Sequence, residues 1–208
     1  IDYATAGRRL RARACALFFL AAIAQSTHAA DVVISQIYGG GGNSGAPFRR
    51  DFIELVNRGA SPVTLSGWSI QYAGAASSSW QKVDLPSRLL QPGQYLLIGG
   101  AAGATGTELP AVDVNSGINL SASQGKVALV ASVGVIPTGT TCPMGAAIID
   151  FVGYGAANCS EGAGPAPAGD NQAAVLRLGD GCVDQDSNAA DFGRLGRYHA
   201  FECGDAFM

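Results

Sequence analysis

Short apolar segments of strand length recur along this chain, and turn-forming residues separate them. No segment keeps a 3.6-residue apolar repeat over three turns, as a long amphipathic helix would. About seven to nine short strands between Gly, Pro, Asn, Asp and Ser loops predict an all-β protein, either a sandwich or a barrel. Two packed antiparallel sheets of this size favour an immunoglobulin-like β-sandwich. The segments are VVISQIY (32–38), FIELVN (52–57), WSIQY (68–72), WQKVDL (80–85), QYLLIGG (94–100), INLS (118–121), KVALVAS (126–132), AAIIDFVGYG (146–155) and AVLRL (174–178).

The N-terminal region has the organisation of an export signal. Four arginines between residues 8 and 13 precede an apolar stretch, residues 14–24, that is too short for an ordinary membrane anchor. Thr27 and Ala29 are small residues at the positions that a signal peptidase reads, so we expect cleavage after Ala29. A short buried helix is the alternative. Nothing after residue 30 approaches the ~18 consecutive apolar residues of a membrane span, so the sequence predicts a secreted protein, extracellular or periplasmic.

This cleavage divides the chain into three parts and changes its charge. The expected parts are a signal peptide (1–29), a β-sandwich domain (30–193) and an atypical C-terminal tail (194–208). The signal carries four of the 13 basic residues and one of the 16 acidic ones, which leaves 9 against 15 and a net charge of −6. Such a charge repels nucleic acid. We therefore expect no nucleic-acid binding by this domain alone, and a protein or surface partner that the sequence does not identify.

Four cysteines remain after the expected cleavage, which suits an exported chain with two disulfides. Three connectivities are possible, and we predict the local pairing of Cys142 with Cys159 and of Cys182 with Cys203. A metal site is the alternative, but no CxxC spacing occurs and His199 is the only histidine that remains.

Several ordered motifs resemble the lamin-tail domain family. They are FIELVN, LSGWSIQY, LQPGQYLLI, GKVALV, IIDFVGYG and DGCVDQDSNAADF, and they extend from Val32 to Phe192. The chain is most similar to the bacterial secreted branch. The resemblance implies an immunoglobulin-like β-sandwich that acts as a binding or tethering module, often found beside extracellular nuclease or phosphatase domains. The ending GRLGRYHAFECGDAFM departs from the family pattern, which makes a truncated remnant or accessory domain of a secreted nuclease or phosphatase the alternative function.

The acidic segment DGCVDQDSNAADF (180–192) is the candidate metal site. Asp184, Asp186, Asn188 and Asp191 could direct several oxygen ligands at a calcium ion. The segment lacks the glycine and the final glutamate of an EF-hand loop, however. An Asx-rich turn, in which these side chains accept hydrogen bonds from backbone amides, is the favoured interpretation, with calcium as the alternative. No other cofactor is indicated.

Catalysis is not expected from this chain alone. No Ser or Cys motif is accompanied by a credible base, and one histidine cannot build a nuclease centre. Glu54, in the middle of FIELVN, is the carboxylate that most needs an explanation. We interpret it as a structural residue with a cross-strand ion pair or hydrogen bond, to Lys82, Arg58 or a backbone amide.

Overall fold

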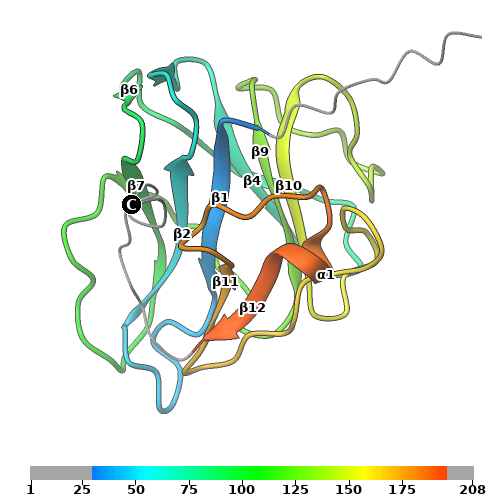
Figure 1. The fold of residues 1–208 in the computed structure, drawn as a ribbon. Coiled ribbons are helices and arrows are strands. Elements are labelled where there is room, and N and C mark those ends of the chain that lie inside the picture. The colour runs from blue at the N-terminus through cyan, green and yellow to red at the C-terminus, as the bar shows by residue number, and fades with distance from the viewer. Residues whose placement is uncertain (1–29, 196–208) are drawn as a thin grey trace, which may run out of the picture.

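Twelve strands and one short helix form from the alternating segments, as seen in a computed structural model that describes residues 30–195 (Figure 1). Most of the predicted segments are strands, and four further strands are short or lie at the C-terminal end. The elements are β1 (Val32–Tyr38), β2 (Arg50–Asn57), β3 (Val63–Thr64), β4 (Ser69–Ala73), β5 (Gln81–Asp84), β6 (Leu89–Leu90), β7 (Tyr95–Ala102), β8 (Val114–Asn115), β9 (Gly125–Val130), β10 (Ile148–Tyr154), β11 (Ala174–Arg177), α1 (Asn188–Asp191) and β12 (Phe192–Leu195).

Two main sheets make up the sandwich. One has the strand order β12-β11-β1-β2-β7-β8 and the other has the order β10-β9-β4-β5, with β3 and β6 paired separately. All neighbouring strands are antiparallel except β7 and β8. The predicted all-β, immunoglobulin-like sandwich is therefore confirmed. The last strands of the domain lie beside its first strand, β1, so the C-terminal segment completes the larger sheet.

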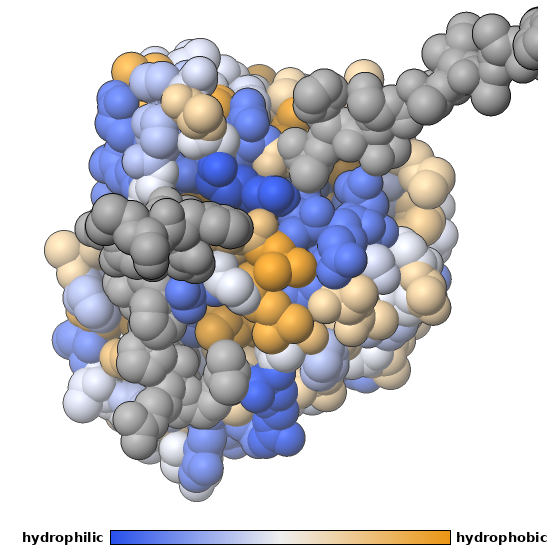
Figure 2. All heavy atoms as spheres, viewed as in Figure 1, coloured by the Kyte–Doolittle hydropathy of each residue, from blue (hydrophilic) through white to orange (hydrophobic). Residues whose placement is uncertain are grey.

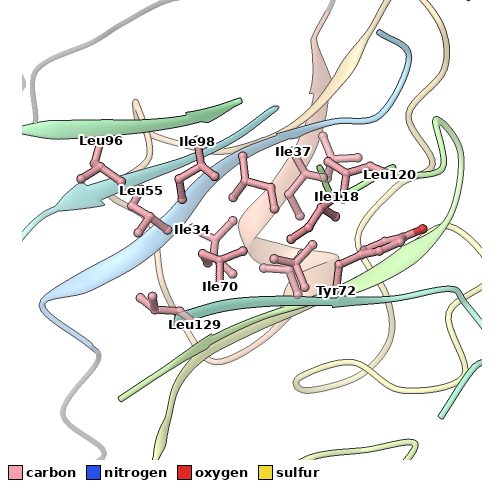
Figure 3. Close-up of a cluster of buried hydrophobic side chains, with 14 of the residues drawn as sticks. Ile34, Ile37, Leu55, Ile70, Tyr72, Leu96, Ile98, Ile118, Leu120 and Leu129 are labelled. Atoms are coloured by element: carbon pink, nitrogen blue, oxygen red, sulfur yellow. The ribbon is translucent and has the colours of Figure 1, made fainter. Parts of the chain in front are cut away.

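The main core fills the space between the two sheets. Side chains from β1, β2 and β7 point towards side chains from β4 and β9 (Figure 3). Strand alternation accounts for this set, because every second residue of each strand faces the partner sheet. Burying such a side chain contributes roughly 1.5–3 kcal/mol, so this layer is the main source of stability. It includes Ile34, Ile37, Leu55, Ile70, Tyr72, Leu96, Ile98 and Leu129.

The segment INLS (118–121) is not a strand, and the prediction was wrong there. Ile118 and Leu120 are buried in the core, as their apolar character requires. Their backbone groups bond elsewhere: the Ile118 carbonyl accepts from Ala101 N, and Leu120 N donates to the Asp51 carboxylate. An apolar alternation can thus mark buried residues of an extended loop that makes only isolated hydrogen bonds with its neighbours.

A second apolar cluster covers the outer face of the four-stranded sheet. Residues 131–147, which connect β9 to β10 and which we call the β9–β10 loop, contribute Ile136 to it. Trp80, Phe151 and Cys159 pack in the same cluster. The loop therefore turns what would be a solvated sheet face into a buried layer.

One of the expected parts of the chain lies wholly outside the described residues, and another lies partly outside them. The signal peptide, residues 1–29, lies outside the described residues, as does the tail from residue 196 onward. The last strand, β12, continues to Leu195, beyond residue 193 where the sequence suggested the domain would end.

Candidate functional site

Arg177, on β11, is the centre of a buried charged network between the sheets. Its side chain has no exposed surface. Nη2 donates to both Asp150 carboxylate oxygens, at 2.9 and 2.8 Å, and Nε donates to the Ile34 carbonyl at 2.9 Å. The guanidinium also stacks on the Phe192 ring, 4.5 Å from its centroid. Burial raises the pKa of Asp150, and the Arg177 charge opposes that rise. Because a buried charge is costly unless paired, these contacts make Arg177 a structural residue.

The acidic segment supplies further partners of this network. Asp184 lies 3.2 Å from Arg177 Nη1 and 2.9 Å from Arg58 Nη1. Asp191 lies 3.7 Å from Arg177 Nη1, and its carboxylate accepts from the backbone amides of Gln185 and Ser187. These hydrogen bonds from backbone amides are the ones expected of the Asx-rich turn, which the sequence favoured over a calcium site.

Asn188, the third residue of the candidate calcium set, is completely buried and fastens α1 to β10. Its Oδ1 accepts from Gly153 N at 2.8 Å and from Glu161 N at 3.1 Å. Its Nδ2 donates to the Phe151 carbonyl at 2.9 Å and to Glu161 Oε2 at 3.1 Å. This one amide side chain thereby satisfies two backbone groups of β10, Gly153 N and the Phe151 carbonyl, at a sheet edge where another chain could otherwise pair.

Asp186, the fourth residue of the set, is exposed and lies apart from the network. Its backbone has a positive φ of 54°, which Asp tolerates better than most residues. Within residues 30–195, no hydrogen bond or ion pair reaches its carboxylate. In the same part of the chain, no group of three or more His, Cys, Asp or Glu side chains is arranged to hold a metal ion. Calcium binding by the four residues stays the alternative to the Asx-rich turn, to be tested by calorimetric titration of the domain.

Glu161 lies beside Asn188, between the network and solvent. Its Oε1 accepts from Phe151 N at 3.2 Å. Burial raises its pKa to about 8, repulsion from Asp150 adds to the rise, and Arg177 opposes it. Glu161 is therefore a second edge cap for β10.

Glu54 makes a cross-strand hydrogen bond, as expected, but to a different partner. Ser35, on β1, donates its hydroxyl to Glu54 Oε1 at 2.8 Å. The suggested partners were wrong, because Lys82 pairs with Asp84 and Arg58 pairs with Asp184. Only the tertiary structure determines this, since β1 has a bulge between Ile34 and Gln36 that places Ser35 opposite the carboxylate.

Two neighbouring carboxyl groups of β2 are buried on opposite faces of the strand, as their alternation predicts. Burial raises the pKa of Glu54 to about 7, and the Ser35 hydrogen bond opposes that rise. Burial also raises the pKa of Asp51 to about 6, against hydrogen bonds from Leu120 and Gly41 amides. Neither has a described basic partner, and both hold loops or strands together.

The β9–β10 loop is a feature that the sequence reasoning missed. Buried polar side chains of the sheet beneath it bind its backbone. Gln71 donates to the Gly134 carbonyl and accepts from Ile136 N, each at 2.8 Å. Trp80 Nε1 donates to the Thr140 carbonyl at 2.8 Å. One property of the sequence could have revealed this loop. Residues 131–147, which lie between two strands, contain no charged residue.

Lys126 also holds the β9–β10 loop, by a hydrogen bond to the Thr141 carbonyl. Its side chain is fully buried, although it projects from the outer face of β9. Nζ donates to the carbonyls of Ser77 and Thr141 and to Asn158 Oδ1, at 2.7, 2.8 and 2.7 Å. Burial lowers the pKa of Lys126. Three loops therefore converge on one ammonium group, and one of them is the β9–β10 loop.

A disulfide completes the attachment, as the sequence predicted. Cys142, in the loop, is bonded to Cys159, with a Cα–Cα distance of 5.4 Å. The second predicted pair, Cys182 with Cys203, falls partly outside the described residues and stays a prediction. The loop backbone is thus held on both sides, yet Val133, Val135 and Met144 are 50%, 51% and 87% exposed.

A pocket lies at one end of this loop, with a volume of about 430 Å³. The disulfide, Met144 and Phe151 form its apolar walls, while Glu161 and Asp186 contribute carboxyl groups at its rim. The pocket therefore joins the apolar loop to the acidic segment.

Comparison with models of known protein families shows to which family this β-sandwich belongs. The lamin tail domain model matches residues 25–156. The chain belongs to the lamin-tail domain family. No curated protein matches it in a sequence search.

The match ends before the strands that complete this lamin-tail domain. β11, α1 and β12 follow residue 156, as do Arg177 and the whole acidic segment. The family fold supports a binding or structural module. Among residues 30–195, no helix is long and apolar enough to cross a membrane.

Proposed function

We propose that this chain is a secreted, non-catalytic binding or tethering module of lamin-tail type, which holds its partner through the β9–β10 loop. The observation that carries the proposal is the contrast within that loop. Its backbone is held by Gln71, Trp80, Lys126 and a disulfide, while its apolar side chains face solvent. A loop ordered in advance loses little conformational entropy on binding, and loops on a rigid sandwich are common contact surfaces.

The titratable groups support a non-catalytic role. Residues 30–195 contain no histidine. The buried Asp51, Glu54, Asp150 and Lys126 are all engaged in hydrogen bonds that hold strands or loops together. A general acid or base needs access to substrate, which these contacts deny.

Export is supported by the N-terminal sequence and by the disulfide. Four arginines followed by a short apolar stretch have the form of a signal peptide. The Cys142–Cys159 bond suits an oxidising compartment.

Site-specific photo-crosslinking tests the binding role. A benzophenone amino acid placed at Val135 is compared with the same group at Leu89, which is equally exposed at 51% but lies on β6. The mature protein is irradiated among the extracellular proteins of the producing cells. We expect a discrete adduct from position 135 and none from position 89. Equal adducts at both positions, or none at position 135, contradict the proposal.

A phosphodiesterase assay tests the non-catalytic role. We expect the purified mature chain to hydrolyse bis(p-nitrophenyl) phosphate no faster than buffer. Hydrolysis that disappears in a folded Glu54→Gln or Glu161→Gln variant would show the opposite.

A further inference from the structure

The pocket between the β9–β10 loop and the acidic segment combines an apolar wall with an acidic rim. Met144, which is 87% exposed, lines it together with the buried Phe151 and Cys159. Asp186 and Glu161 line it as well. In Figure 2, weakly apolar residues lie among hydrophilic ones on the right-hand side, where Figure 1 places the yellow loop that follows β10.

The charges around this pocket do not balance. Asp150, Asp184 and Asp186 all raise the pKa of Glu161 electrostatically, and Arg177 is the cation that opposes them. Arg177 is already bound to Asp150 and Asp184 in the interior, and Arg58 is already bound to Asp184. The Asp186 carboxylate has no partner within the described residues. An additional positive charge at the rim would therefore be attracted, and the uncharged β9–β10 loop would not repel it.

We propose that the pocket receives an arginine or lysine side chain from an extended segment of a protein partner. The aliphatic stem lies against Met144 and Phe151, and the cationic head lies at Asp186. Long basic side chains suit such a site, because they bury apolar stems while they keep their charge at a polar edge. A protein segment is favoured over a free amine, since Val133, Val135 and Met144 offer further exposed apolar contacts on the same loop. This inference rests on the proposed binding function and adds the chemistry of the partner.

Peptide titration of the ¹⁵N-labelled mature protein tests the inference. The probe is acetyl-Gly-Leu-Arg-Leu-Gly-amide, and the matched peptides replace Arg with Gln or Glu. We expect the Arg peptide to shift the amide signals of Gly145, Ile148 and residues 160–162 at about 1–5 mM, a range typical of short peptides. The Gln peptide should bind about fivefold more weakly, as expected for one exposed ion pair.

Substitutions in the protein show which residues the peptides contact. Asp186→Asn keeps the shape and tolerates the positive φ, and it should weaken the Arg peptide about fivefold without affecting the Gln peptide. Met144→Ala should weaken both peptides. The matched controls, Asp84→Asn and Leu89→Ala, alter an exposed carboxylate and an exposed apolar side chain on β5 and β6, and should leave both affinities unchanged.

Several outcomes would overturn the inference. Equal binding of the Arg and Gln peptides would remove the role of charge. Agmatine that binds as tightly as the peptide would assign the site to a small amine. Shifts of the same amides with protein concentration alone would assign it to a second copy of this chain. A protein crosslinked at Val135, together with no response to any of the peptides, would support the proposed binding function. It would show that this pocket does not take a basic side chain.

Discussion

Arg177 and Asp150 join the two sheets of the sandwich, with one guanidinium nitrogen of β11 bound to both carboxylate oxygens of β10 at 2.9 and 2.8 Å. Both side chains are almost completely buried. β11 lies in the six-stranded sheet and β10 in the four-stranded one. The two strands are not joined by main-chain hydrogen bonds, so the ion pair between their side chains links the two sheets.

Arg177→Met should destabilise the domain strongly, because it leaves the buried carboxylates of Asp150 and Asp191 without their cation. Breaking one side of a buried pair costs about 3–5 kcal/mol. Urea denaturation of the two proteins measures the difference. The control is Arg49→Gln, which breaks an exposed pair with Glu108 and should cost less than about 1 kcal/mol. Similar losses for the two variants would refute the structural role of Arg177.

Glu54 should make the domain less stable as pH rises. Its folded pKa, about 7, lies above its ordinary value of 4.5, so the folded state binds more protons between these values. The contribution of Glu54 to stability is therefore fully present below pH 4.5 and is lost as the pH rises through about 7. Burial raises the pKa of Asp51 and Glu161 as well, and both act in the same direction.

Glu54→Gln isolates this contribution. Its amide oxygen can still accept from Ser35, but it carries no charge. The variant should be more stable than the natural protein at pH 8, by on the order of 2 kcal/mol, and equal to it near pH 4.5. Thermal unfolding at the two pH values gives the comparison. A destabilised variant at pH 8 would mean that the carboxylate has an ionic partner.

Loss of the Cys142–Cys159 bond should loosen the β9–β10 loop. The bond closes a loop with a sequence separation of 17, and cross-links of this length contribute about 3 kcal/mol in the chain-entropy account. The double variant Cys142→Ser/Cys159→Ser should unfold at lower urea concentration, and amide exchange should accelerate in residues 131–147. If exchange there stays unchanged, Gln71, Trp80 and Lys126 hold the loop without the disulfide.

Asn188→Asp should separate α1 from β10. The two bonds that Oδ1 accepts can remain, but the donors to the Phe151 carbonyl and Glu161 are lost and a charge is added beside Glu161. We expect a loss of about 2–4 kcal/mol, measured by urea denaturation, together with concentration-dependent association through the uncovered strand edge. Ser187→Ala is the control, because the Ser187 side chain forms no capping bond.

The sequence by itself determined the class of fold and much of the strand set. Alternating apolar residues between turn residues specify strands locally. VVISQIY was therefore predicted with the bounds that β1 has, and FIELVN was predicted two residues short of the start of β2. The local pairing of Cys142 with Cys159 also followed from short separation. Family motifs within these same strands led to the lamin-tail resemblance, which the family match confirms.

Only the tertiary structure decided which polar groups are buried and what they contact. AVLRL shows an arginine in a strand, but it does not show that Asp150 of β10 and Asp184 and Asp191 of the acidic segment meet it. Lys126 occupies a position that alternation assigns to solvent, and the β9–β10 loop covers it. Strand patterns depend on neighbours along the chain, whereas burial of a charge depends on what the rest of the chain places over it.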